Sequence, residues 1–100
     1  MAQIIWSDSS IDDLRAIGEF YERSSPAYAS IIVTELYTSV SQLRDYPQSG
    51  RIVPELNEQP IRELVVRGFR IVYKLTRDKV RIVTVLHSRQ DLSDKLSDLD

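Results

Sequence analysis

The stretch that decides the fold runs from residue 61 to residue 87 and reads IRELVVRGFRIVYKLTRDKVRIVTVLH. It is rich in β-branched residues and alternates with a period of two, which is typical of β-strands. Two short interruptions divide it: Arg67-Gly68 suits a tight hairpin turn, and residues 76–79 suit a second. The stretch therefore predicts three antiparallel strands, at residues 61–66, 69–75 and 80–87, joined as one meander.

The two turns set a register between these strands, because a slip of one residue would exchange the two faces of the sheet. The expected opposite pairs are Val65 with Arg70, Glu63 with Val72, Arg70 with Val85, Val72 with Val83, and Lys74 with Arg81. A helical layer is then expected on the face that holds Leu64, Val66, Phe69, Ile71, Tyr73, Ile82, Thr84 and Leu86. The opposite face is expected to carry Arg70 and His87 as diagonal neighbours.

The residues before this stretch read as one strand and two helices. Residues 3–6 indicate a short strand, and Ile11, Leu14, Ile17, Phe20 and Tyr21 recur at helical spacing in a helix over about residues 9–23. A second helix is expected to begin with Ser25 as N-cap and Pro26 at its first position, and to end near Asp45. Residues 47–57 read as a loop. The order predicts an α+β fold, β-α-α-β-β-β, with an antiparallel helical hairpin packed on a mostly antiparallel sheet.

The composition narrows the function classes. A chain of 100 residues without cysteine and with one histidine excludes disulfides, a cysteine nucleophile and a multi-histidine metal site. Neither a bilayer-spanning apolar run nor a signal peptide is visible, so we expect a cytoplasmic protein with no membrane partner and no cofactor. The net charge of −2 conceals a basic middle: residues 51–90 hold nine Lys or Arg against four Asp or Glu, a balance of +5. This predicts a localised positive surface for nucleic acid or an acidic protein segment, or else a solvated strand face.

Several short phrases occur in an order that resembles the RelE/ParE toxin superfamily of bacterial type II toxin–antitoxin systems. They are the strand ending in Trp6, Ser25-Pro26 at the helical turn, Pro47 with Gly50-Arg51, Val53-Pro54-Glu55-Leu56, Ile61-Arg62-Glu63-Leu64, Phe69-Arg70-Ile71-Val72-Tyr73 and Val85-Leu86-His87. The resemblance implies a single toxin domain over residues 1–92, with residues 93–100 as an acidic tail or short helix. It also implies a cognate antitoxin whose C-terminal segment wraps the toxin, and contact with operator DNA only through that antitoxin.

The superfamily divides by target, and the ParE-like branch is favoured here. That branch inhibits DNA gyrase without acid–base chemistry, and we expect the helical hairpin and the C-terminal segment to form the contact surface. The chain is net acidic and its last 13 residues lack an aromatic side chain, whereas ribosome-directed members favour positive charge and a base-stacking residue. An inactive relative that serves as a binding or regulatory module is a further alternative.

The other branch, RelE/YoeB-like, cleaves mRNA on the ribosome without metal. Under that alternative the protein is an enzyme, with Glu55 as base, His87 as acid and Arg70 as phosphate clamp. A structural role is the alternative for His87 and Glu55, because a lone histidine at a strand end and a glutamate in a loop are usually structural. Arg70 could instead bind acidic residues of the antitoxin. The candidate antitoxin- or phosphate-binding cations are Arg62, Arg70, Arg81 and Arg89.

Overall fold

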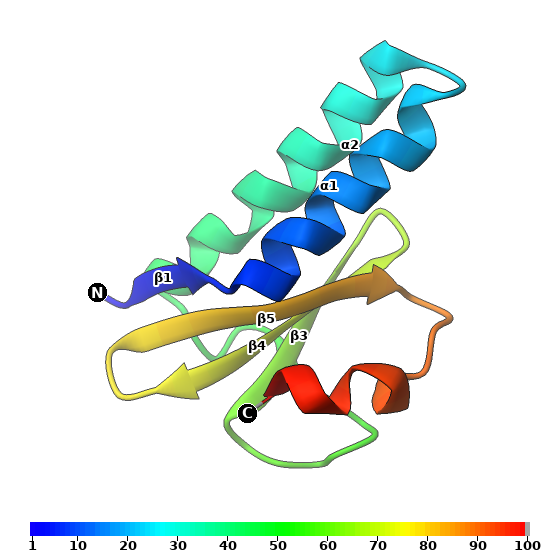
Figure 1. The fold of residues 1–100 in the computed structure, drawn as a ribbon. Coiled ribbons are helices and arrows are strands. Elements are labelled where there is room, and N and C mark those ends of the chain that lie inside the picture. The colour runs from blue at the N-terminus through cyan, green and yellow to red at the C-terminus, as the bar shows by residue number, and fades with distance from the viewer. Residues whose placement is uncertain (100) are drawn as a thin grey trace.

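A helical hairpin lies across one face of a five-stranded sheet in the computed structural model, which describes residues 1–99 (Figure 1). In chain order the elements are β1 (Gln3–Trp6), α1 (Asp8–Glu22), α2 (Pro26–Ser39), the 3₁₀ helix η1 (Val40–Arg44), β2 (Arg51–Ile52), β3 (Ile61–Val66), β4 (Phe69–Thr76), β5 (Lys79–His87) and the 3₁₀ helix η2 (Leu92–Leu99). The sheet order is β1-β5-β4-β3-β2, in which only β1 and β5 run parallel. The predicted α+β fold is confirmed.

Serine caps begin both helices. The Ser7 hydroxyl accepts a hydrogen bond from the Ser10 amide at 3.1 Å, and the Ser25 hydroxyl accepts one from the Tyr28 amide at 3.1 Å. Pro26 occupies the first turn of α2, where its missing N–H costs nothing. The predicted start of the second helix is therefore confirmed, while its expected last turns form the separate helix η1.

The β3–β4 hairpin follows the predicted register, with Val65 opposite Arg70 and Glu63 opposite Val72. Its two-residue turn places Arg67 at φ 50° and Gly68 at φ 79°, the left-handed values that a tight hairpin turn requires. The turn predicted at Arg67-Gly68 therefore gave the correct register between β3 and β4.

The β4–β5 register agrees with the prediction at Lys74 but departs from it between Val72 and Arg70. Lys74 lies opposite Arg81 as expected, but an irregularity between Val72 and Tyr73 shifts the pairing by one residue. The predicted pairs of Val72 with Val83 and of Arg70 with Val85 are therefore wrong: the observed partners are Thr84 and Leu86. A β-bulge of this kind adds a residue to one strand and reverses the side-chain alternation beyond it.

Two hydrophobic cores result, one on each face of the sheet. The helix-side core joins Leu14, Ile32, Leu36, Val40, Leu43, Phe69, Ile71, Tyr73, Val80, Ile82 and Val85. The second core joins Val53, Ile61, Val72, Val83, Leu86 and Leu92. Because of the bulge, Val85 and Leu86 have exchanged the faces that were predicted for them.

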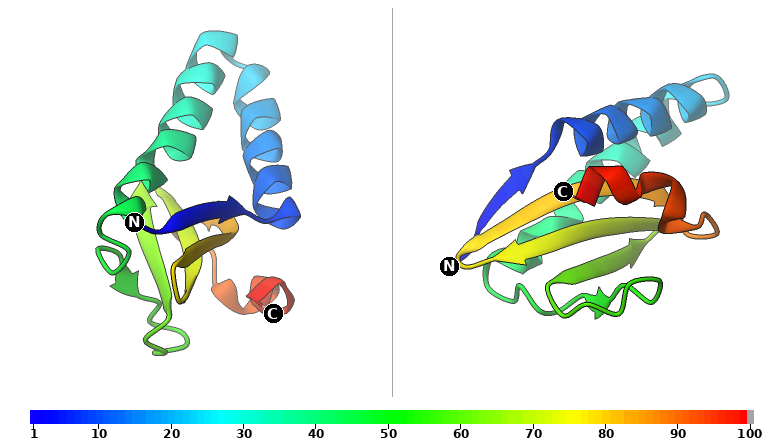
Figure 2. Two further views of the ribbon diagram at one scale, coloured as in Figure 1. Left: turned by 90° about the vertical axis from the view of Figure 1, so that its left-hand side faces the viewer. Right: turned by 60° about the horizontal axis from the view of Figure 1, so that its bottom comes forward.

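The second core is closed by two segments whose place in the fold was not predicted from the sequence. The predicted loop contains the short strand β2, and residues 53–56 and η2 cover the sheet face opposite the helices (Figure 2). Leu92 is fully buried there, and Lys95 forms an ion pair with Asp13 of α1 at 3.2 Å. Residues 93–99 thus lie within a helix, while Asp100 falls outside the described residues.

The aromatic residues of β1 and α1 differ in burial. Trp6 and Tyr21 are half-buried against the helix-side core, and Trp6 stacks on Tyr37 with ring centroids 5.3 Å apart. Phe20 of α1 is 62% exposed and meets Tyr21 edge to face, with ring centroids 5.1 Å apart. Within residues 1–99, no helix is long and apolar enough to cross a membrane.

Candidate functional site

Arg70 lies at the centre of a charged network on the sheet face opposite the helices. Its Nε donates to Glu63 Oε1 at 2.6 Å, while its Nη1 and Nη2 donate to the two oxygens of Glu55 at 2.7 Å each. Glu63 also accepts a 2.6 Å hydrogen bond from Arg51 Nε. We call Arg51, Glu55, Glu63 and Arg70 the arginine–glutamate network; its two positive and two negative charges balance.

The two most buried members of the network, Arg70 and Glu63, are closely surrounded by hydrogen-bond partners. Arg70 is 5% exposed and Glu63 1% exposed. A fourth hydrogen bond from Arg70 Nη1 reaches the carbonyl oxygen of Gln90 at 3.0 Å, so four of the five guanidinium N–H groups have protein acceptors. A phosphate oxygen would have to displace a carboxylate to bind Arg70 in bidentate fashion.

The ionisation of Glu55 follows from this arrangement. The hydrogen bonds that Arg70 donates lower the pKa of the Glu55 carboxyl from 4.5 to about 2, against a smaller opposing effect of burial. The same pair raises the pKa of Arg70 above its usual value. A carboxylate with so low a pKa is a weak base at neutral pH, because proton transfer is most effective when the pKa lies near the working pH.

The network also fastens the C-terminal segment to the sheet. Glu55 Oε2 accepts a hydrogen bond from the Leu92 amide at 3.1 Å, and Arg70 holds the Gln90 carbonyl. Both bonds fix the start of η2, whose Leu92 side chain enters the second core. In this structure Glu55 and Arg70 therefore connect three segments that lie far apart in the sequence.

His87 lies on the other side of the sheet, which contradicts its predicted place beside Arg70. It is paired across the strands with Phe69, a helix-side residue, and the two rings meet edge to face with centroids 5.7 Å apart. Its Nδ1 accepts a 3.2 Å hydrogen bond from the Arg89 amide. The bulge in the β4–β5 pairing explains the error, since it turns His87 to the face opposite Arg70. The structure thus brings Glu55 and Arg70 together and separates them from His87.

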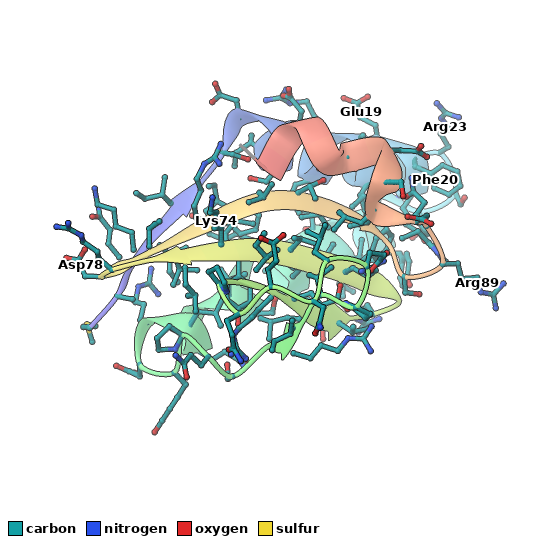
Figure 3. All side chains as sticks on the ribbon, turned by 90° about the horizontal axis from the view of Figure 1, so that it is seen from below. Glu19, Phe20, Arg23, Lys74, Asp78 and Arg89 are labelled. Carbon is teal, nitrogen blue, oxygen red and sulfur yellow. The ribbon has the colours of Figure 1, made fainter. Side chains whose placement is uncertain are left out.

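The other predicted cations have three different environments. Arg62 clamps the preceding loop, donating to the carbonyl oxygens of Gln48, Gly50 and Gln59. Arg81 is half-buried in β5 between Ile5 of β1 and Lys74 of β4. Arg89 is exposed and projects from the turn after β5 (Figure 3). In the part of the chain that is described, no cluster of three or more His, Asp or Glu side chains could hold a metal ion.

Two members of the network, Arg51 and Glu63, were not among the candidate site residues predicted from the sequence. A signal for Glu63 was present, because the correct β3–β4 register already placed it on the face of Arg70, two residues along the strand pair. A buried carboxylate on that face requires a cation. Arg51 had no comparable signal, since its strand has only two residues.

Solved structures share this arrangement of elements. The fold matches a chain of the chromosomal ParDE toxin–antitoxin system from P. aeruginosa with a TM-score of 0.75 and 20% identity, over 87% of this chain and 96% of that one. It also matches a variant of the E. coli toxin RelE in the free state with a TM-score of 0.67 and 14% identity, over 98% of this chain and 94% of that one. The chain therefore shares its fold with these proteins of toxin–antitoxin systems.

Sequence comparison gives the family within that class. The family described as ParE toxin of type II toxin–antitoxin system, parDE, matches residues 4–92, and the chain belongs to it. Toxin RelE2 of Caulobacter vibrioides is 33% identical over 89 residues, which are 88% of this chain and 97% of that protein. The resemblance stated from the sequence motifs is confirmed at the level of the superfamily, and the chain is a toxin of a type II system.

Proposed function

We propose that this toxin inhibits DNA gyrase by binding it, and that a cognate antitoxin neutralises the toxin. The proposal rests on the positions and contacts of Glu55, Arg70 and His87, the three residues that RNA cleavage would need. Glu55 and Arg70 satisfy each other within the network, and His87 lies across the sheet from them. A surface that acts by binding requires no acid–base pair, and the net charge of −2 does not oppose contact with a protein.

The membership of the ParE family points in the same direction. Within the proposal, the C-terminal segment contributes to the gyrase contact, as the sequence indicated. Deletion of residues 93–100 is then expected to weaken gyrase inhibition while leaving Leu92 in the second core. Unchanged inhibition by the truncated toxin would remove this segment from the contact.

Ribosome-dependent cleavage of mRNA is the second candidate. It is favoured by the likeness of Glu55, Arg70 and His87 to the YoeB residues and by the name of the relative RelE2. It requires the network to open and His87 to reach the opposite face, so that base, acid and clamp surround one phosphate.

The first experiment compares purified wild-type toxin with a Glu55→Gln/His87→Ala double variant in gyrase supercoiling assays. We expect both proteins to inhibit supercoiling, with thermal melts confirming that the variant is folded at the assay temperature. In cells, pulse labelling should show DNA synthesis falling before translation. An early fall in translation, abolished in the double variant, would establish the nuclease alternative and refute gyrase inhibition.

A further inference from the structure

The structure separates the nine cations of the basic middle, residues 51–90, into groups with different surroundings. Three are neutralised by carboxylates and a fourth donates to three carbonyl oxygens; they are Arg51, Arg67, Arg70 and Arg62, respectively. Arg89 lies apart, on the turn after β5. The other four lie within eight consecutive residues of the β4–β5 hairpin, and they are Lys74, Arg77, Lys79 and Arg81. The positive charge of the basic middle is therefore concentrated at this hairpin.

The hairpin forms a basic end on an acidic molecule. Residues 74–81 hold the four cations against one carboxylate, Asp78, a balance of +3 in a chain of net charge −2, so the other 92 residues carry −5. Lys74 and Arg81 pair across the strands, on the sheet face away from the helices. Figure 3 shows Lys74 and Asp78 toward the same end of the molecule, far from Arg89. Like charges are thus gathered at one end instead of being spread over the surface.

Three of these cations have no carboxylate partner in the described part of the chain. Lys74 is half-buried, Arg77 and Lys79 are exposed, and none of the three takes part in an ion pair there. By contrast, five other lysines and arginines of the same residues each pair with an aspartate or glutamate. Neighbouring like charges repel one another, so this cluster is best stabilised by an anion from outside the chain.

The backbone at the tip of the hairpin gives a second observation. Arg77 has a φ of 52°, in the left-handed region that glycine and asparagine adopt at lower cost. Arg67, in the turn of the β3–β4 hairpin, has a φ of 50°, but its side chain is paired with Glu35. Arg77 makes no such pair with a described residue, so nothing there offsets the strain. Residues held in a strained backbone cluster at functional sites, which points to a ligand for Arg77 outside the chain.

A polyanion fits this end of the molecule better than the carboxylates of a second protein. An exposed ion pair between side chains contributes little, because both charges are well solvated and two long side chains must be held in place. DNA instead carries one phosphate charge per about 1.7 Å of its axis, and each phosphate that a lysine or arginine neutralises releases condensed counterions. This gain requires no fixed geometry, which suits the long, flexible side chains of Lys74, Arg77 and Lys79.

We propose that the β4–β5 hairpin binds the phosphate backbone of the DNA that gyrase holds. Lys74, Arg77 and Lys79 each lie against a phosphate, and this contact adds to the binding of the toxin to gyrase itself. The contact does not depend on base sequence, because phosphates carry no sequence information. The inference rests on the proposed function, since gyrase brings the DNA to the toxin.

The test compares the affinity of the full toxin for gyrase alone with its affinity for gyrase that holds a short duplex. We expect wild type to bind the DNA-bound enzyme at least about tenfold more tightly than the DNA-free enzyme. Arg77→Gln/Lys79→Gln, checked for folding by thermal melts, should lose most of this gain and keep its affinity for DNA-free gyrase. The matched control is Arg15→Gln/Arg23→Gln on α1 and its C-cap, which changes the net charge equally and should keep the gain. Because the gain is a ratio, it is unaffected if α1 itself touches gyrase.

Two results of this comparison would overturn the inference. An equal loss of affinity for DNA-free and DNA-bound gyrase in the hairpin variant would assign its cations to acidic groups of gyrase. A gain that is absent in wild type, or unchanged in the hairpin variant, would leave the hairpin as a solvated end of the sheet.

Binding to the duplex alone separates this inference from the proposed function. If wild-type toxin does not bind gyrase, the proposed function fails, and fluorescence anisotropy of a labelled duplex still measures the phosphate contact. Three phosphate contacts predict that a fourfold rise in salt, from about 25 to about 100 mM, weakens the binding of wild type about 40-fold and that of Arg77→Gln/Lys79→Gln about fourfold. An equal salt dependence of the two proteins would overturn the phosphate contact whatever the target.

Discussion

Arg70→Ala should destabilise the fold severely, and this bears directly on how a loss of toxicity is interpreted. The substitution removes four hydrogen bonds, two of them to the Glu55 carboxylate and one to Glu63. Glu63 would then remain 1% exposed with Arg51 as its remaining ion-pair partner. The Leu92 amide would keep Glu55 as acceptor, but the carboxylate would lose the group that positions it.

The magnitude follows from the burial of the pair. Breaking a buried ion pair by removing one partner costs about 3–5 kcal/mol. Domains of this size have a free energy of unfolding of about 5–15 kcal/mol, so Arg70→Ala should remove about a fifth of it or more. With an unfolding entropy of about 2.1 cal/mol/K per residue, the melting temperature should fall by about 15–25 °C.

Urea denaturation followed by the fluorescence of Trp6, the single tryptophan, measures the effect. Arg51→Ala is the matched control, because Arg51 holds the same Glu63 carboxylate from a side chain that is 61% exposed. A half-exposed pair of this kind contributes at most about 1 kcal/mol. If Arg70→Ala stays within about 1 kcal/mol of wild type, the structural account of the network is refuted. A stable but non-toxic Arg70→Ala would then assign Arg70 to target contact or chemistry.

Three further predictions concern stability. Gly50→Ala should lower the free energy of unfolding by about 2 kcal/mol through overpacking, since its Cβ would lie 2.5 Å from the Tyr73 hydroxyl. The Cβ of Gly68→Ala meets no atom within 4 Å, so this variant should lose only about 1 kcal/mol, through its left-handed φ of 79°. The urea midpoints of the two variants test this difference. Ser25→Ala should cost about 1 kcal/mol through loss of the α2 cap, detected as a lower melting temperature with an unchanged fold by circular dichroism. The pKa of Glu55 is about 2 in the folded protein and 4.5 for the free carboxyl, so its ionisation stabilises the fold fully above about pH 4.5. This stabilisation is lost as the pH falls toward 2. Glu55→Gln should therefore flatten that part of the pH dependence of the urea midpoint, and an unchanged dependence would contradict the ion pair.

The sequence predicted well those features that depend on local chemistry. Ser25-Pro26 marks a helix start because the Ser25 hydroxyl accepts from a free amide of the first turn and Pro26 has no amide hydrogen to leave unpaired. Arg67-Gly68 marks a hairpin turn because Gly68 tolerates left-handed φ. The register of β3 against β4 followed from that turn. Each of these features is decided within four residues, so no tertiary information was needed.

The bulge beside Val72 could not be predicted in the same way. Nothing in the residues around it requires an extra residue in β5, and the longer strand is accommodated by contacts with other segments. Ser7 donates to the Val83 carbonyl, and Asp13 accepts hydrogen bonds from Thr84 and from the Val85 amide. These bonds join β5 to α1 over about 70 residues of sequence. The position of His87, and with it the predicted catalytic grouping, depended on this non-local event.

A sequence motif alone does not determine where its side chains lie, so a motif shared with a relative does not by itself carry over a function. Glu55, Arg70 and His87 stand in an order that matches a ribonuclease, yet a one-residue shift in strand pairing separates His87 from the other two. Glu55 and Arg70 meanwhile acquire a structural task, because together they hold the start of η2 over the second core. A pair that fastens the C-terminal segment would be retained in a toxin that performs no chemistry. The motif and a binding function are therefore compatible, because the network gives Glu55 and Arg70 a structural role that requires no chemistry.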